Sequence, residues 1–421
     1  MKLFSHGSNT DKYLVALDIG TEYTKAVIAE LVDDDSTNDI RVVGVGRARQ
    51  EFGNMASGAI SDITGVVKNC ETALMMAEEQ SGVQAKRAVI GIAGEFVKGI
   101  TSTVRYRRPD ADRVLDVAEI ELIVGKIQER AAQKARQQLS FETGVEDIEV
   151  KLVNSAIVGI HIDGYKISNP VGFTGKDVTV QIYTAFAPAM HISALERTAR
   201  SLDLELLAVA AEPFAVARAV LGNENKQSYS AVLCDIGGGS TDIAVVNEGG
   251  VEGTQMFGVA GRSFTKMIAD DLNIGYEAAE KLKLNLDDNA VREKLKSKLI
   301  EAVDRTLEVW SSGVQIALEE FHSIDHLPPR VLLCGGGSEL SKLVDYLKHS
   351  DWYVDLPFAH RPDIKHISAA DVSGIVDSTG DIKGCNFITA LGLLRVGHDT
   401  ILTSSGQDNG IKGKLDRLLR I

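Results

Sequence analysis

Hydrophobic and polar positions divide the chain into short strands and amphipathic helices. Over residues 13–30, two apolar runs flank a polar turn, which predicts two short strands joined as a hairpin. Residues 63–79 and 114–139 carry apolar side chains at helical spacing, and residues 290–321 predict one or two long amphipathic helices. An apolar run at residues 87–92 predicts another strand between these helices. Strands and helices are therefore mixed along the chain.

The hairpin phrase occurs twice. ALDIGTEYTKAVI at residues 16–28 and CDIGGGSTDIAVV at residues 234–246 each place Asp-Ile-Gly after an apolar run and a Thr before the next one. The alignment superimposes Asp18, Ile19, Gly20 and Thr24 on Asp235, Ile236, Gly237 and Thr241. Similarity at a distance of about half the chain suggests a duplicated domain with two equivalent halves.

The repeated turn has the chemistry of a phosphate site. A tight, glycine-bearing turn exposes several backbone N–H groups together, and such a concavity binds phosphate oxygens. Asp18 and Asp235 would repel a bare phosphate, but Mg²⁺ keeps most of its waters and needs only one or two carboxylates beside it. Two such hairpins facing each other would hold a polyphosphate and Mg²⁺, with hydroxyls added by Thr24, Ser240 and Thr241. The alternative is a plain hairpin, because Asp and Gly are common turn residues.

A third glycine-rich turn follows another apolar run. VLLCGGGSELSKLVDYL predicts a strand, the triplet Gly335, Gly336 and Gly337, and then a helix. Three glycines after a buried strand allow a flat ligand to lie against bare backbone, and the amino terminus of a helix favours anionic groups. A flexible turn without a ligand is the alternative.

Glu212 stands at the start of a predicted helix in the first half, in the phrase LAVAAEPFAVARAVLG. Its carboxylate either caps that helix or orients a water near a terminal phosphate. TALGLLRVG occupies the corresponding place in the second half. Small residues would let these two helices pack closely between the halves, namely Ala215, Ala217, Ala390 and Gly392.

Length, charge and cysteine content narrow the class of protein. The 421 residues suit two to four domains, and the net charge of -14 argues against general nucleic-acid binding. The four cysteines lie far apart without a CxxC pair, which suits reduced thiols in a cytosol. The amino terminus lacks a secretory signal, and no apolar stretch is long enough to span a membrane. The basic cluster around Arg47 and Arg49 lacks interleaved aromatics and is interpreted as a solvated face.

The carboxy-terminal residues 411–421 are basic, although the chain as a whole is acidic. On a helix, apolar residues gather on one side and basic residues on the flanks, and anionic lipid attracts each such charge by about 1 kcal/mol. The pattern predicts a helix that orders on a membrane, after a polar linker. A last helix packed on the body is the alternative. The residues expected to contact the membrane are Ile411, Lys414, Leu415, Arg417, Leu418, Leu419 and Arg420.

These motifs, in this order, resemble the actin, sugar-kinase and heat-shock ATPase superfamily. LDIGTEYTKAVI is similar to its first phosphate loop, CDIGGGSTDIAVV to its second and CGGGSEL to its adenosine motif. Within the superfamily, VIGIAGEFVKGITSTVRY and ISNPVGFTGKDVTVQIYTAFAP are similar to the sequences that bound the extra subdomain of the FtsA family of bacterial cell division. GVAGRSFTKMIADDLNIGYEAAEKLKLN is similar to the FtsA stretch after the second phosphate loop.

The resemblance implies an α/β, actin-like (ribonuclease H-like), duplicated two-domain ATPase fold with an inserted FtsA-type subdomain. It also implies ATP and Mg²⁺ as ligands, with Asp18 and Asp235 on the magnesium side and Glu212 positioning water in any hydrolysis. Phosphates would be held by Gly20, Thr21, Gly237, Gly238, Gly239 and Thr241, and adenosine by Glu280, Lys283, Gly335, Gly336 and Gly337. The expected divisions are 1–85 with 177–227 (first half), 86–176 (inserted subdomain), 228–272 with 325–397 (second half), 273–324 (small helical subdomain), 398–410 (flexible linker) and 411–421 (membrane helix).

The function implied by the resemblance is a protein on the cytoplasmic face of the cell membrane that forms filaments and tethers the FtsZ ring. The implied partners are the FtsZ carboxy-terminal peptide, further copies of the chain, anionic lipid and other membrane proteins of the division machinery, without nucleic acid. Nucleotide would mainly regulate assembly, with weak hydrolysis at most. The region that would dock FtsZ is shorter than in many FtsA proteins, and a compact version resembles PilM. A PilM-like pilus-assembly adaptor, which binds ATP and a membrane partner's peptide, is therefore an alternative, and a sugar kinase or active ATPase is a third.

Overall fold

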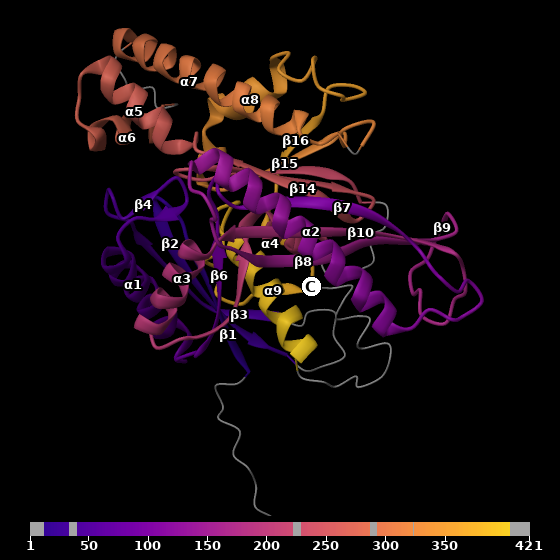
Figure 1. Cartoon of the computed structure of the whole chain (residues 1–421). Coiled ribbons are helices and arrows are strands. Elements are labelled where there is room, and N and C mark those ends of the chain that lie inside the picture. Colours follow the sequence, from indigo (N-terminus) through magenta and orange to yellow (C-terminus); the bar gives the residue numbers. More distant parts are fainter. Residues whose placement is uncertain (1–11, 33–39, 222–228, 287–292, 323, 405–421) are drawn as a thin grey trace, which may run out of the picture.

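The structure is a computed structural model that describes residues 12–32, 40–221, 229–286, 293–322 and 324–404. Figure 1 shows two large sheets with helices packed between and around them, and α5, α6 and α7 grouped at one end of the molecule. The helices are α1 (Ile63–Ser81), α2 (Val117–Thr143), α3 (Ala189–Ser201), α4 (Glu212–Leu221), α5 (Gly261–Leu272), α6 (Tyr276–Leu284), α7 (Glu293–Glu319), α8 (Ser341–His349) and α9 (Ile388–Ser404), with short 3-10 turns η1 (Gly336–Glu339) and η2 (Ala369–Asp371).

The first sheet has six strands in its described part. In sheet order they are β11 (Glu205–Ala211), β6 (Arg87–Ile92), β1 (Tyr13–Ile19), β2 (Tyr23–Leu31), β3 (Ile40–Arg49) and β17 (Ile375–Asp377). β1 pairs antiparallel with β2 and parallel with β6, so it is a central strand, and its residues from Leu14 onward are buried. A strand buried on both faces explains the near-continuous apolar run that the sequence shows there.

The second sheet has nine strands in its described part and joins the second half to the inserted subdomain. In sheet order they are β16 (Asp363–His366), β15 (Arg330–Cys334), β12 (Ala231–Ile236), β13 (Thr241–Asn247), β14 (Gly250–Phe257), β7 (Lys98–Arg107), β10 (Asp177–Pro188), β8 (Val150–Ile162) and β9 (Tyr165–Lys166). The junction is the short antiparallel pairing of β14 with β7 at Gly253↔Ile100 and Thr254↔Gly99. A separate small hairpin is formed by β4 (Met55–Ala56) and β5 (Ala59–Ile60).

The duplication inferred from the repeated phrase is visible in the pairing of the strands. The order β11-β6-β1-β2-β3 in the first sheet corresponds to β16-β15-β12-β13-β14 in the second. In each run the first three strands are parallel and the last three antiparallel. The two DIG phrases therefore end equivalent central strands, β1 and β12.

Helices α4 and α9 lie between the two sheets and belong to a hydrophobic cluster that includes strands of both (Figure 1). Their close approach depends on Gly392 of α9, because a Cβ there would overlap the carbonyl group of Ala215 in α4. The small residues therefore play the packing role that the sequence indicated.

Two strands pair in a different sheet from the one that the expected domain bounds imply. The other bounds remain predictions. Strand β6 lies within residues 86–176, assigned to the insertion, yet it pairs with β1 and β11 in the first sheet. Strand β10 lies within residues 177–227, assigned to the first half, yet it pairs with β7 and β8 of the inserted subdomain. By strand pairing, the insertion begins after β6 and extends through β10.

The expected start of the linker is corrected. Helix α9 continues through residue 404, so residues 398–404 are helical and not irregular. His398 and Asp399 are buried, and Asp399 accepts a 2.6 Å ion pair from Arg218 of α4. This pairing holds the polar residues against the body. No described helix is both long and apolar enough to cross a membrane. The candidate membrane-contacting residues 411–421 lie outside the described residues.

Candidate functional site

A cavity of about 490 Å³ opens between the two sheets, a size within the range of small-molecule and cofactor sites. Its walls come from both DIG hairpins, from the glycine triplet after β15, and from α4, α5 and α6. The predicted site residues that line it are Asp18, Gly20, Thr21, Glu212, Asp235, Gly237, Gly238, Gly239, Ser240, Glu280, Lys283, Gly335, Gly336 and Gly337.

The two hairpin bends lie directly against each other. In each bend the first glycine N–H donates to the carbonyl three residues on, at 3.1 Å for Gly20 and 2.9 Å for Gly237. A Cβ at Gly239 would stand 2.5 Å from the Thr21 hydroxyl oxygen, and one at Gly238 would stand 2.7 Å from the Glu22 Cβ. Glycine is therefore required because backbone from one half approaches side chains of the other.

Asp18 and Asp235 occupy equivalent places but have opposite neighbours. In the first hairpin, Asp18 is the cross-strand partner of Lys25, and the Lys25 ammonium donates to its carboxylate at 2.8 Å. Burial alone would lower the pKa of Lys25, but the charge of Asp18 and the hydrogen bond to it outweigh burial and raise that pKa. In the second hairpin, the cross-strand partner of Asp235 is Asp242, a like charge.

Ionisation of both carboxyl groups of the second pair, Asp235 and Asp242, is unfavourable. Burial, and then the charge of Asp235, raise the pKa of Asp242 well above its usual range. Burial also raises the pKa of Asp235, although a hydrogen bond from the Thr389 hydroxyl opposes the shift. Asp242 Oδ1 is buried and has no hydrogen-bond partner. An unpartnered carboxylate oxygen in an acidic cluster favours a bound cation.

The residues fit a hydrated divalent cation better than a fully protein-ligated one. Within the described residues, no group of three or more His, Cys, Asp or Glu side chains is arranged to hold a metal. Mg²⁺ needs only one or two carboxylates and takes its remaining ligands from water and phosphate. Asp18, Asp235 and Asp242 are carboxylates on the cavity wall that satisfy this requirement.

Glu212 lies at the first position of α4 and is 7% exposed. Burial, followed by the charges of Asp18, Asp242 and Asp235, raises the pKa of Glu212 well above its usual range. Gly91 makes room for it, since a Cβ there would stand 2.7 Å from Glu212 Oε1. Its carboxyl therefore belongs electrostatically to the same cluster as the three aspartates.

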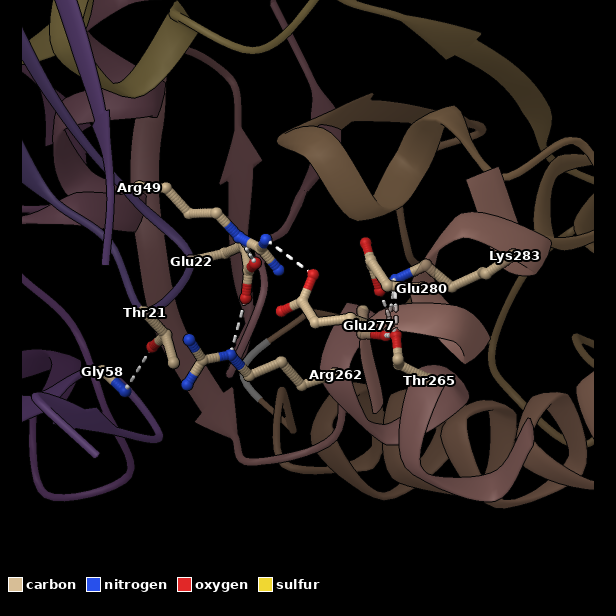
Figure 2. A network of polar contacts seen from close by, with 10 residues as sticks. Thr21, Glu22, Arg49, Gly58, Arg262, Thr265, Glu277, Glu280 and Lys283 are labelled. Atoms are coloured by element: carbon tan, nitrogen blue, oxygen red, sulfur yellow. Dashed lines mark hydrogen bonds and ion pairs between the residues drawn. The ribbon is translucent and has the colours of Figure 1, made fainter. Parts of the chain in front are cut away.

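The other end of the cavity combines bare backbone with an ion pair. Gly335 has φ of 81°, a left-handed conformation that favours glycine, and a Cβ at Gly337 would stand 2.8 Å from the Ile236 carbonyl oxygen. Lys283 forms a 2.8 Å ion pair with Glu280 and donates to the Gly261 carbonyl at 3.0 Å. Figure 2 shows that Glu280 and Lys283 both contact the Thr265 hydroxyl.

Comparisons with known proteins agree with this geometry. The model of the family "Cell division protein FtsA" matches residues 232–392. FtsA of Pseudomonas aeruginosa is 24% identical over 92% of this chain and 89% of its own length. FtsA of Bacillus subtilis is 27% identical over 66% of this chain and 59% of its own. This chain is therefore similar in sequence to FtsA proteins over most of its length. The resemblance inferred from the motifs is thereby confirmed.

The actin-like fold is confirmed as well. A solved chain of the PilM–PilN type IV pilus biogenesis complex has a TM-score of 0.64 to this structure, with 18% sequence identity, and the match covers 91% of this chain and 98% of that one. At this identity the likeness is one of fold. This chain and a protein of the pilus biogenesis complex thus share one architecture, which agrees with the resemblance to PilM.

Two predicted phosphate-site residues, Thr24 and Thr241, are not among the residues that line the cavity. Thr24 is fully buried, and its hydroxyl accepts a 2.8 Å hydrogen bond from the Gln50 amide. Thr241 is also fully buried, donates to the Val259 carbonyl at 2.7 Å and accepts from the Trp310 indole at 2.9 Å. Both hydroxyls are therefore hydrogen-bonded within the protein, directly beside the bend of a hairpin.

Sequence reasoning missed several residues on the cavity wall. Lys25 and Asp242 stand at equivalent positions of the repeated phrase, seven residues after Asp18 and Asp235, so the alignment itself contained the signal: a charge within an apolar strand. Arg262 also lines the cavity, and it follows Gly261 at the start of α5. Its partner, Glu22, comes from the other half of the chain, and no local pattern indicates that pairing.

Proposed function

We propose that this chain is an ATP-binding cell-division protein that polymerises on the cytoplasmic face of the membrane and tethers the FtsZ ring. The observation that carries the proposal is the convergence of both duplicated hairpins and the glycine triplet on one cavity. Similarity to curated FtsA proteins over most of the chain supports the division role.

In this proposal the bends hold the phosphates and the acidic cluster holds Mg²⁺. Gly20, Thr21, Gly237, Gly238, Gly239 and Ser240 form the phosphate cradle. Lys25 adds a buried positive charge beside Asp18, and the aspartates bind the cation through its water shell. Mg²⁺ held there would neutralise part of the negative charge of the phosphates.

The adenosine would lie against the glycine triplet, with Glu280 and Lys283 beside it. Both side chains line the cavity and hold each other in place through their ion pair. Because Gly335, Gly336 and Gly337 carry no side chain, a flat base can approach the backbone closely.

Glu212 is the residue we assign to any hydrolysis. It faces the same cluster of carboxylates, and a general base must reach a water near the terminal phosphate. Its raised pKa favours the protonated form in the unliganded protein, and a neutral carboxyl is a poor base.

Titration calorimetry with MgATP tests the site. We expect binding by the full chain and loss of binding in the double variant Asp18→Asn/Asp235→Asn. The matched control is Asp112→Asn/Asp345→Asn, two exposed aspartates outside the cavity. The proposal fails if the first double variant keeps the affinity of the unaltered chain while remaining folded.

The membrane and FtsZ roles need their own tests, because residues 411–421 lie outside the described part of the chain. In liposome flotation with anionic lipid, the full chain should float and a chain cut after Gly410 should stay in solution. A truncated chain that still floats contradicts the anchor.

The second candidate is a pilus-assembly adaptor, which the shared fold with the PilM–PilN chain favours. Pull-down of the full chain with FtsZ carboxy-terminal peptides against tail peptides of pilus membrane proteins separates the two. Capture of FtsZ peptide alone supports the division role, and capture of the pilus peptide alone overturns it.

A further inference from the structure

Four charged side chains form a chain of ion pairs at the edge of the cavity (Figure 2). We call this chain the clasp: Glu22, Arg49, Arg262 and Glu277. The Glu22 carboxylate accepts from Arg262 at 2.7 Å and from Arg49 at 2.8 Å, and Arg49 also donates to Glu277 at 3.0 Å. A single carboxylate therefore holds two guanidinium groups, and one of these holds a second carboxylate.

The clasp joins the two halves of the molecule. Glu22 lies in the bend between β1 and β2, and Arg49 ends β3, so both belong to the first sheet's half. Arg262 lies at the start of α5 and Glu277 at the start of α6, and both follow the second hairpin along the chain. The pairs Glu22–Arg262 and Arg49–Glu277 therefore both cross from one half to the other.

The two crossing pairs differ in burial. The side chains of Glu22 and Arg262 are 16% and 12% exposed, whereas that of Glu277 is 67% exposed. Exposed ion pairs contribute little, but a close pair shielded from water is much stronger. The Glu22–Arg262 pair is the inner, strong member of the clasp. Burial opposes ionisation of Glu22, yet the hydrogen bonds from Arg262 and Arg49 hold its pKa below the usual range.

The inner pair is also built into the phosphate bends. Glu22 follows Thr21, and Arg262 donates its backbone N–H to the Gly238 carbonyl at 2.7 Å. Both side chains line the cavity. A second, apolar contact crosses beside them: the rings of Phe52 and Tyr276 lie 5.7 Å apart, with the Arg262 guanidinium 5.5 Å from the Phe52 ring. Opening the cavity along this edge requires all of these contacts to separate.

We propose that the Glu22–Arg262 pair is a latch that holds the two halves together over the occupied cavity and slows release of the nucleotide. The inference rests on the proposed function, because it needs a nucleotide in the cavity. The latch keeps the two halves closed over the nucleotide and is not needed for the nucleotide to enter. Its loss should therefore raise the dissociation rate far more than it lowers the association rate.

The test is stopped-flow release of a fluorescent ATP analogue from the full chain with Mg²⁺, chased with excess ATP. We expect Glu22→Gln and Arg262→Gln each to speed release by about tenfold, which corresponds to about 1.4 kcal/mol. The double variant should release no faster than the single ones, because both substitutions remove the same pair. Glu79→Gln, an exposed substitution on α1, is the matched control.

The outcomes separate the latch from the site. Release within twofold of the unaltered chain in both single variants overturns the latch while leaving the nucleotide site intact. Additive effects in the double variant also overturn it, because they place the two residues in separate roles. Failure of the unaltered chain to bind the analogue overturns the proposed site and the latch with it. If one single variant does not fold, the other decides.

Discussion

Substitution of Gly392 by alanine tests the crossing of α4 and α9, on which the geometry of the cavity depends. A Cβ at this position would lie inside van der Waals contact of the carbonyl carbon and oxygen of Ala215, and 3.1 Å from the Val216 nitrogen. These are backbone atoms of a helix, so they cannot rotate away as a side chain would. The Cβ would lie 2.1 Å from the Ala215 carbonyl oxygen, so the helices must move apart by roughly 1.4 Å for it to reach a normal separation of about 3.5 Å.

Two contributions of opposite sign, helix propensity and overpacking, determine the change in the free energy of unfolding. Alanine in a helix interior is favoured over glycine by about 1 kcal/mol. Overpacking of a well-packed interior costs about 1–3 kcal/mol, and rigid backbone on the facing side puts this site at the upper end. The expected net loss is about 2 kcal/mol. At roughly 2–4 °C for each kcal/mol in a large domain, the unfolding temperature should fall by about 5 °C.

Thermal unfolding followed by circular dichroism measures this loss, and Gly125→Ala is the matched control. Gly125 also lies in a helix, α2, but a Cβ there would meet nothing within 4 Å. It should therefore leave the unfolding temperature unchanged or slightly raised. Because α4 begins at Glu212 and α9 carries Thr389, which hydrogen-bonds to Asp235, Gly392→Ala should also reduce the stabilisation that MgATP provides. An unfolding temperature equal to that of Gly125→Ala would refute the argument.

Three further predictions concern single side chains. Lys25→Met should lower the free energy of unfolding in urea by about 3 kcal/mol, because it leaves the buried Asp18 carboxylate unpaired; a loss below about 1 kcal/mol would contradict the buried ion pair. Glu212→Gln should keep MgATP binding but reduce any phosphate release by about 100-fold, and an unchanged rate would remove Glu212 from hydrolysis. Burial against Phe96 lowers the pKa of His191, so the folded state binds a proton less readily than the unfolded chain. Stability is therefore present above the unfolded pKa of about 6.5 and falls as the pH drops below it, and His191→Gln should flatten that dependence in urea titrations.

The sequence predicted the duplicated architecture because its signal is local and repeated. Each DIG hairpin contains its own turn, flanking strands and glycine, and the same pairing recurs in β1–β2 and β12–β13. The glycine triplet and the small residues of α4 and α9 are also local signals, because close approach of backbone excludes any larger side chain. These features fixed the place of the cavity.

What the sequence could not predict depends on partners distant in the chain. The hydroxyl of Thr241 was expected to meet phosphate, but Trp310 and Val259 occupy it. Strand β6 has an apolar pattern that fits either sheet, and only its pairing with β1 decides the matter. The side chain of Arg49 is 41% exposed, as a solvated face predicts, but its ion pair with Glu277 of the other half is not visible in the sequence. A periodic pattern reports that a face is buried or charged, and not what lies opposite.

The two hairpins differ in the charge beside their equivalent aspartates, so the two sides of the site are electrostatically different despite the duplication. Lys25 neutralises Asp18 in the first half, whereas Asp242 places a second carboxyl group beside Asp235 in the second, and the two repel each other when both are ionised. A nucleotide is itself an anion, so it cannot relieve this repulsion. A divalent cation arriving with the nucleotide can, because its charge is compensated by the pair on one side and by phosphate on the other. Binding should therefore require the cation on the side of the second hairpin. The equivalent position in the first hairpin already holds a positive charge from the protein.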